Sequence, residues 1–227
     1  MQTNIIKPET MKKTILLFAV VLMAIPLLSQ GKKYTKTMRK AIEMRADASD
    51  RQSAIKCAST FEEISESYSE QWLPHYYAAE VLITNSFEER ELKLKDEMLD
   101  RAWTNLDKAR ELAPKESEIE VMKAMYYFSM MSADPETRGP MYYQDAFLSI
   151  ENAKNMNPEN PRAHYLDGVM ALNMPDFMGG GPHAAKPLFL KAAEKFESYK
   201  NEDPLWPDWG ADLVKEELDK MKDINSE

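Results

Sequence analysis

The stretch "GGGPH" (residues 179–183) has the composition of an anion cradle. Glycines let the backbone pass close to a ligand, and the free amides at the start of a following helix attract negative charge. A site of this kind would use Gly180, Gly181 and His183. The same glycines could also form a simple turn between two helices. We favour the turn, because no Walker-type Gly-Lys-Ser follows and Pro187 interrupts the start of the next helical pattern.

Other residues capable of chemistry form no recognisable motif. His75, His164 and His183 lack the spacing of metal ligands. The chain has no His-Glu-x-x-His, no Gly-x-Ser-x-Gly and no Cys-x-x-Cys. Carboxylates crowd into segments such as "FEERELKLKDEMLD", but a charge-rich helix face is usually solvated. We therefore expect no enzyme activity, no catalytic residue, no metal site and no cofactor.

The N-terminus has the composition of a secretory signal peptide. Lys12 and Lys13 precede an apolar run over residues 15–28, which is shorter than the roughly 20 residues that span a bilayer. Small or polar residues follow at Ser29 and Gln30. We expect residues 1–30 to be removed, with residues 1–10 as a possible upstream start extension. The remaining chain would have no membrane span and would be periplasmic or secreted.

The expected mature chain is acidic. The full chain has 29 basic and 38 acidic side chains, and residues 1–30 contain three lysines and one glutamate. Removing them leaves 26 and 37, a net charge of −11. This excess repels backbone phosphates, so nucleic acid and anionic membranes are poor partners. The single cysteine, Cys57, cannot form an internal disulfide, and its helical neighbours indicate a buried small residue.

A recurring spacing of small and apolar residues predicts the helices that position the candidate side chains. In "AWTNLDKARELAP", counted from Ala102, small residues stand at offsets 0 and 7, a large apolar residue at offset 4 and a proline at offset 12. Copies begin at Ala146 and, more weakly, at Ala185 and Cys57, so successive copies are 45, 44 and 39 residues apart. Small residues let neighbouring helices approach closely, and a proline ends each unit. The period is typical of stacked helical hairpins.

We therefore predict an all-α fold, a helical-hairpin solenoid of about four hairpins plus a C-terminal capping helix. It would form a single domain over residues 31–227. No alternation of apolar and polar residues indicates a strand. The expected helices cover residues 36–46, 50–68, 71–84, 86–112, 117–132, 142–155, 160–172, 182–199 and 208–222.

These residues resemble the tetratricopeptide repeat (TPR) family, whose unit pairs a helix A carrying a small residue with an alanine-rich helix B and a closing proline. Ala79, Ala124 and Gly168 occupy the small position of helix A. The resemblance covers most of residues 50–200, although the units are about ten residues longer and the tryptophan of helix A is not at its expected place. The glycine-rich turn and following helix also resemble, more weakly, periplasmic repeat proteins that accompany TRAP-type solute transporters.

The family resemblance implies a concave groove lined by the inner helices. Its aromatic and methionine content suits an apolar peptide segment or a small hydrophobic ligand. Some of these side chains could instead be core residues, Phe128 among them, but the polar tips of Tyr76, Arg162 and Tyr165 favour the groove. The candidate binding residues are Tyr76, Glu80, Met125, Phe128, Arg162 and Tyr165.

A second candidate surface comes from two long connections, "SADPETRGPMYY" and "NMPDFMGGGPH". They occupy the same place in successive hairpins, so we expect them to emerge at one edge of the stack. Their side chains could instead fold inward to cover the core. The candidate residues of this loop edge are Arg138, Met141, Tyr142, Phe177 and Met178.

Two functions follow from these surfaces. The first is a periplasmic or secreted scaffold that mediates protein–protein interaction, holding a protein partner or peptide segment through its groove and loop edge. The alternative is a binding protein for a small hydrophobic molecule that serves a solute transport system. The repeat fold does not decide between them, because such folds support many unrelated functions.

Overall fold

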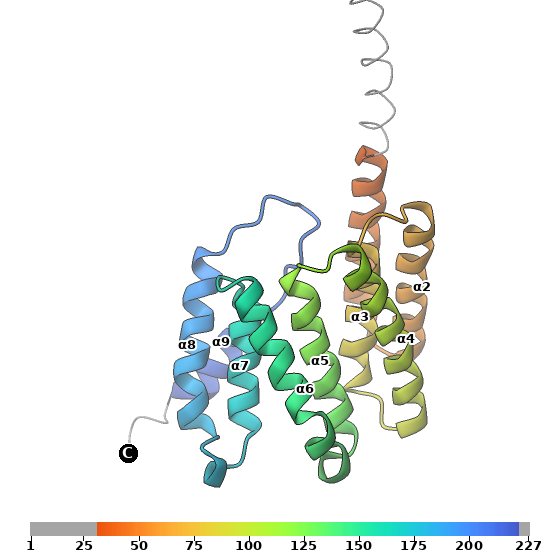
Figure 1. Cartoon of the computed structure of the whole chain (residues 1–227). Coiled ribbons are helices and arrows are strands. Elements are labelled where there is room, and N and C mark those ends of the chain that lie inside the picture. Colours follow the sequence, from red (N-terminus) through yellow and green to blue (C-terminus); the bar gives the residue numbers. More distant parts are fainter. Residues whose placement is uncertain (1–30, 223–227) are drawn as a thin grey trace, which may run out of the picture.

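The computed structural model describes residues 31–222, and no strand occurs among them (Figure 1). Residues 31–44 form the first helix. It is followed by α2 (Arg51–Ser67), α3 (Leu73–Ser86), α4 (Leu92–Leu112), α5 (Ser117–Ala133), α6 (Pro135–Met156), α7 (Pro161–Asn173), α8 (Pro182–Ser198) and α9 (Ala211–Lys220), with short 3₁₀ turns η1 (Arg45–Asp47) and η2 (Asp176–Met178). The expected signal peptide lies outside the described residues.

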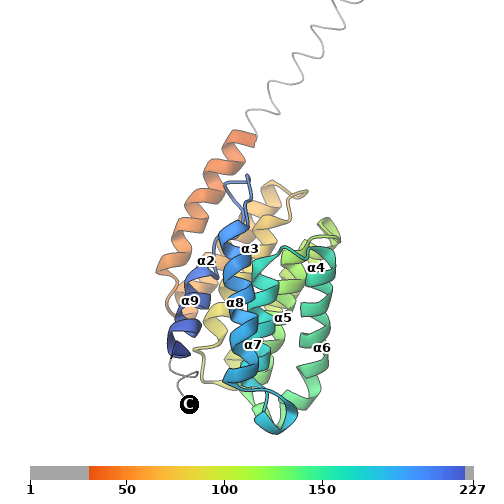
Figure 2. The ribbon, with the colours of Figure 1, turned by 90° about the vertical axis from the view of Figure 1, so that its left-hand side faces the viewer.

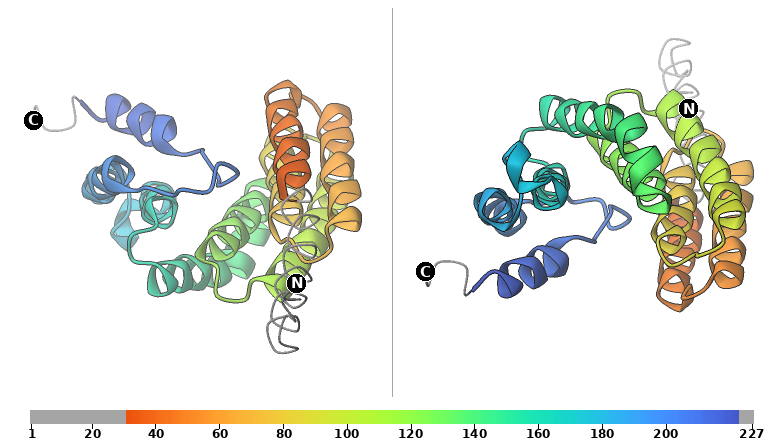
Figure 3. Two further views of the ribbon diagram at one scale, coloured as in Figure 1. Left: turned by 90° about the horizontal axis from the view of Figure 1, so that it is seen from above. Right: turned by 90° about the horizontal axis from the view of Figure 1, so that it is seen from below.

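Consecutive helices pack as pairs, and the pairs stack side by side. The closest pairings are α5 with α6 and α7 with α8, while α5 contacts both α3 and α7 in an inner layer. The axes of α6, α7 and α8 run alongside one another in Figure 2. Seen along the helices, the array is curved (Figure 3). The predicted all-α helical-hairpin fold is therefore confirmed.

The repeated spacing marks the side of each outer helix that faces the stack. Every residue at its offsets 0, 4 and 7 is at most 5% exposed. On α7, Gly168 shows why small residues are needed: an added Cβ would lie 2.7 Å from the Phe189 ring of α8. The buried set comprises Cys57, Phe61, Ile64, Ala102, Leu106, Ala109, Ala146, Ile150, Ala153, Ala185, Phe189 and Ala192.

The start of α6 differs from the sequence prediction. We expected a loop up to residue 141, but the helix begins at Pro135, directly after Asp134. The Asp134 side chain accepts a hydrogen bond from Thr137 N at 3.2 Å, and Pro135 takes the first helical position, where its missing N–H has no cost. The helix continues through Pro140. Part of the expected loop edge, including Arg138, is therefore helical.

Residues 199–210 form a segment that we call the C-terminal strap. It leaves α8, crosses the concave side of the array and returns to α9 (Figure 3). The Tyr77 hydroxyl of α3 donates to the main-chain oxygen of Leu205 at 2.7 Å. The Trp209 indole N–H donates to the Tyr76 hydroxyl at 2.9 Å. The strap therefore covers the inner layer.

The last helix closes the open end of the stack, as the sequence predicts. Helix α9 packs on α8, and its Val214 is buried together with Met221 against Phe189. It is shorter than the range expected from the sequence, because the strap occupies residues up to Gly210. That glycine has a φ of 111°, which allows the sharp entry into α9.

Candidate functional site

The glycine-rich turn uses its own amide groups. Gly179 and Gly181 have φ angles of 86° and 88°, which glycine adopts without strain. All three glycine amides donate to main-chain carbonyls, so none is left for an anion, and His183 is exposed. The turn, which the sequence favours, accounts for the three glycines, and the alternative anion site would have no free amide from Gly180 or Gly181. The bonds run from Gly179 to Asp176, Gly180 to Pro175 and Gly181 to Ala171, at 2.9, 3.2 and 2.9 Å.

Half of the candidate groove residues lie beneath the C-terminal strap. Tyr76, Glu80 and Arg162 belong to the inner helices, but they are only 0%, 8% and 3% exposed. The strap lies on the surface that a partner would have to contact. A peptide could reach these three side chains only by displacing the strap.

A buried network of charges holds the strap. Arg162 donates to the Glu118 carboxylate at 3.1 Å and also to the main-chain oxygen of Pro207. Arg45 donates to Glu80 at 2.6 Å. Burial raises the pKa of Glu118 to about 7, because the loss of hydration outweighs the attraction of Arg162. The network therefore contains a carboxyl group that titrates near neutral pH.

A large apolar cavity lies between α5, α6, α7 and the connection 173–178. We call it the α5–α7 cavity. Its volume is about 1040 Å³, at the upper end of the range for small-molecule sites. Among the described residues, no charged one lines it. The lining consists of Phe87, Met125, Phe128, Met131, Ser132, Pro135, Gly139, Pro140, Tyr143, Gln144, Tyr165, Leu166, Val169, Met170, Asn173, Met174, Pro175 and Met178.

The helical period brings these side chains to one place. On α5, Met125, Phe128 and Met131 are three residues apart and so share a face. The early start of α6 adds Gly139, whose missing side chain leaves open space, since no atom lies within 4 Å of an ideal Cβ. Methionines adapt their shape to a ligand, and aromatic rings present flat apolar faces. The cavity is therefore suited to a large, apolar molecule.

The cavity unites candidates from both predicted surfaces. Met125, Phe128 and Tyr165 come from the predicted groove, and Met178 comes from the predicted loop edge. Burial raises the pKa of Tyr165 to about 12, so its phenol stays protonated at neutral pH. Tyr143, Met170 and Met174 were not among the candidates from the sequence, although 16 methionines in 227 residues are a compositional signal.

The other loop-edge residues lie outside the cavity. Arg138 donates two hydrogen bonds to Asp96, at 2.6 and 2.7 Å. Tyr142 packs its ring on Tyr127, with the centroids 6.0 Å apart. Two side chains are open to solvent: Met141 is 60% and Phe177 is 89% exposed. The last two are the apolar surface that this edge presents.

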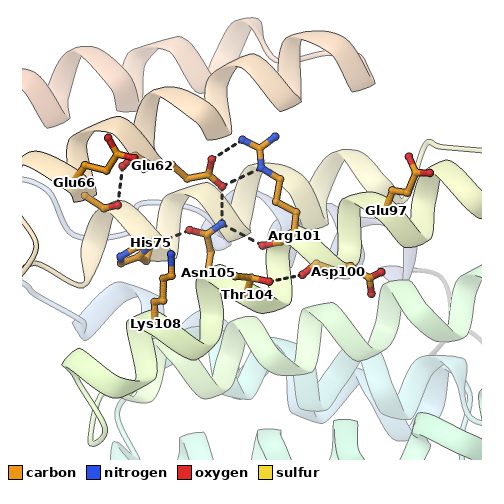
Figure 4. A pocket seen from close by; sticks show the side chains of 10 residues that line it. Glu62, Glu66, His75, Glu97, Asp100, Arg101, Thr104, Asn105 and Lys108 are labelled. Carbon is orange, nitrogen blue, oxygen red and sulfur yellow. Dashed lines mark hydrogen bonds and ion pairs between the residues drawn. The ribbon is translucent and has the colours of Figure 1, made fainter.

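A smaller, polar pocket of about 600 Å³ lies between α2, α3 and α4 (Figure 4). Arg101 and Asn105 both donate to Glu62, and the Asn105 carbonyl oxygen faces His75 Nδ1 at 3.0 Å. That oxygen must accept the His75 proton, because the Asn105 amide group is turned toward Glu62. Burial lowers the pKa of His75, so the ring is neutral at pH 7. These groups satisfy one another and tie three helices together.

Residues 31–222 contain neither a metal-binding group of histidines, cysteines and carboxylates nor a helix able to cross a membrane. No protein-family model matches the chain, and no curated protein is significantly similar in sequence. A solved structure, the HusA haemophore from Porphyromonas gingivalis, is similar in fold, with a TM-score of 0.76 and 25% sequence identity. The similarity covers 87% of this chain and 97% of that one.

Proposed function

We propose that this protein binds a large, flat, apolar molecule of the porphyrin class, such as haem, in the α5–α7 cavity. The observation that carries the proposal is the uncharged, methionine-rich and aromatic lining of a cavity of about 1040 Å³. The similarity in fold to a haemophore supports the same ligand class. We further propose that the mature chain is a single domain over residues 31–227 that acts in the periplasm or outside the cell.

The lining also suggests how such a ligand would be held. In the described part of the chain, no histidine or cysteine lines the cavity, so two of the common protein ligands of haem iron are missing from its wall. Thioether sulfurs and the phenols of Tyr143 and Tyr165 are the groups that iron could meet. We expect burial of the apolar ring to supply most of the affinity, and metal-free protoporphyrin should therefore bind comparably to haem.

The protein-scaffold function is less well supported. Its main surface was the concave groove, where the C-terminal strap already lies and Tyr76 is fully buried. A scaffold would have to rely on the exposed edge around Met141 and Phe177 instead. Membership of the TPR family, which the hairpin spacing suggests, is likewise a proposal, as is service to a solute transport system.

Filling the cavity tests the proposal. We would titrate the wild-type protein and a Gly139→Trp variant with haem and with metal-free protoporphyrin, following the porphyrin absorption band. The indole would occupy open cavity space, and binding of both ligands should weaken by about tenfold or more. Glycine is a poor helix former, so the substitution removes no favourable helical propensity. Circular dichroism would verify the fold.

Met141→Trp is the matched control. It adds the same indole two residues further along α6, at a position that is 60% exposed and outside the cavity lining. This variant should bind as tightly as the wild type. Equal binding by a folded Gly139→Trp variant would show that the ligand does not occupy this cavity, and absence of saturable binding by the wild type would end the porphyrin proposal.

A further inference from the structure

Lys95 of α4 is a buried cation that contacts no carboxylate among residues 31–222. It is only 4% exposed, whereas lysine is almost never fully buried unless it is paired. Among residues 31–222, the one hydrogen bond of its ammonium group goes to Ser132 Oγ at 2.9 Å. An ammonium group carries three donors. Two of the three therefore have no partner in the described part of the chain.

The Lys95 ammonium lies against the wall of the α5–α7 cavity. Both groups that it contacts, Ser132 and Phe87, line that cavity, and its nitrogen is 5.7 Å from the Phe87 ring centroid. The Ser132 hydroxyl donates to the main-chain oxygen of Ser129 at 2.9 Å, so it meets Lys95 with a lone pair. Lys95 is not itself one of the lining residues, so its ammonium group lies behind the wall of an uncharged cavity, next to two side chains that form this wall.

The nearby carboxylates of the described residues form no ion pair with the Lys95 ammonium group. The closest carboxylate along the helix, Asp96, is occupied by the Arg138 guanidinium through two hydrogen bonds. Burial and the charge of Arg138 lower the pKa of Lys95, while Asp96 and Glu89 act on it in the opposite direction from a distance. A negatively charged group entering the cavity would supply the missing partner.

We propose that Lys95 is the carboxylate anchor of the α5–α7 cavity. The ligand class is then an apolar body carrying an acidic group, such as a porphyrin with its propionates, whose ring lies among the methionines and whose carboxylate meets the Lys95 ammonium group. This inference rests on the proposed function and adds the chemical group that decides which apolar molecules are accepted. It also gives a role to the Lys95 ammonium group, which binding of the apolar ring alone would not require.

The experiment compares protoporphyrin IX with its dimethyl ester, which has the same ring but no ionisable acid. The wild type should bind the acid about tenfold more tightly than the ester, as expected for a charge-assisted hydrogen bond in a buried site. Lys95→Met keeps the length and apolar stem of the side chain and removes the charge. It should bind both compounds with the affinity that the wild type shows for the ester.

Lys93→Met is the matched control, because this lysine lies on the same helix with its side chain 80% exposed. It should keep the preference for the acid. If the wild type binds the acid and the ester with equal affinity, Lys95 does not act as a carboxylate anchor. The same conclusion follows if Lys95→Met still prefers the acid. A separate competition assay tests the cavity itself: both compounds should displace haem from the site that Gly139→Trp weakens. If neither displaces haem, the cavity assignment fails, whereas displacement without a preference for the acid contradicts only the Lys95 anchor.

Discussion

Replacing Glu118 with glutamine should make the protein more stable, and more so at higher pH. Glu118 is fully buried, and its carboxyl group meets Arg162 at 3.1 Å. Two effects compete: the ion pair favours the charged form, and burial opposes it. The raised pKa of about 7 indicates that burial dominates. A neutral amide of the same shape avoids that penalty while still able to hydrogen-bond Asn160.

The magnitude follows from the pKa of Glu118 in the two states, about 7 when folded and 4.5 in its ordinary range. Since the folded state holds the proton more tightly, protonation stabilises the fold. This contribution is fully present below pH 4.5 and is lost as the pH rises through 7. Relative to the wild type, the glutamine variant should gain about 1 kcal/mol at pH 5 and about 3 kcal/mol at pH 8.

Urea unfolding at both pH values, followed by far-ultraviolet circular dichroism, measures the two free energies. Glu63→Gln on the exposed side of α2 is the control and should change neither value. A Glu118→Gln variant that is less stable than the wild type at pH 8 would refute the reasoning. That result would mean that the ion pair with Arg162 outweighs the cost of burying the carboxylate.

Three further substitutions or treatments test the packing. Gly168→Leu should lower the free energy of unfolding by about 1–3 kcal/mol, because the leucine side chain would collide with Phe189. Urea titrations measure this change, and unchanged stability would contradict the close contact. Trp209→Phe should cost about 1–2 kcal/mol by leaving the Tyr76 hydroxyl without its donor, and an unaltered urea midpoint would argue against that bond. Cys57 is 2% exposed, and burial raises the pKa of its thiol. It should therefore react with a thiol reagent only when the protein unfolds, and fast labelling of the native protein would show that Cys57 is not buried.

The fold was largely predictable because its main signal is local. The spacing of Ala102, Leu106 and Ala109 is a property of one helix, and close packing between helices demands it in every repeat. The start of α6 was mispredicted, although Asp134 and Pro135 form the same start signal that Asn160 and Pro161 form at α7, an N-cap followed by a proline at the first helical position. The later proline and glycine of that segment resemble a loop, and a proline near a helix start costs little.

The site was predictable only in part, because it depends on contacts between distant segments. The repeat register brought Met125 and Phe128 to the inner layer, but nothing local indicates that Trp209 reaches Tyr76 across 133 residues. The strap and its coverage of the groove were therefore missed. Lys95 belongs to a charge-rich segment whose residues we expected to be solvated, and its burial depends on how α4 packs on α5.

The strap also changes how the chain should fold. Units of an open solenoid contact only their neighbours, so such proteins nucleate anywhere and fray from their ends. Here Arg45, next to the first helix, donates to Asp208, 163 positions later, at 2.8 Å. This contact and the bonds from Tyr76 and Tyr77 to the strap join residues far apart in the sequence, which raises contact order and slows the search for the native topology. We therefore expect the strap contacts to oppose fraying at the ends of the array, and amide hydrogen exchange should be protected evenly from α3 to α7.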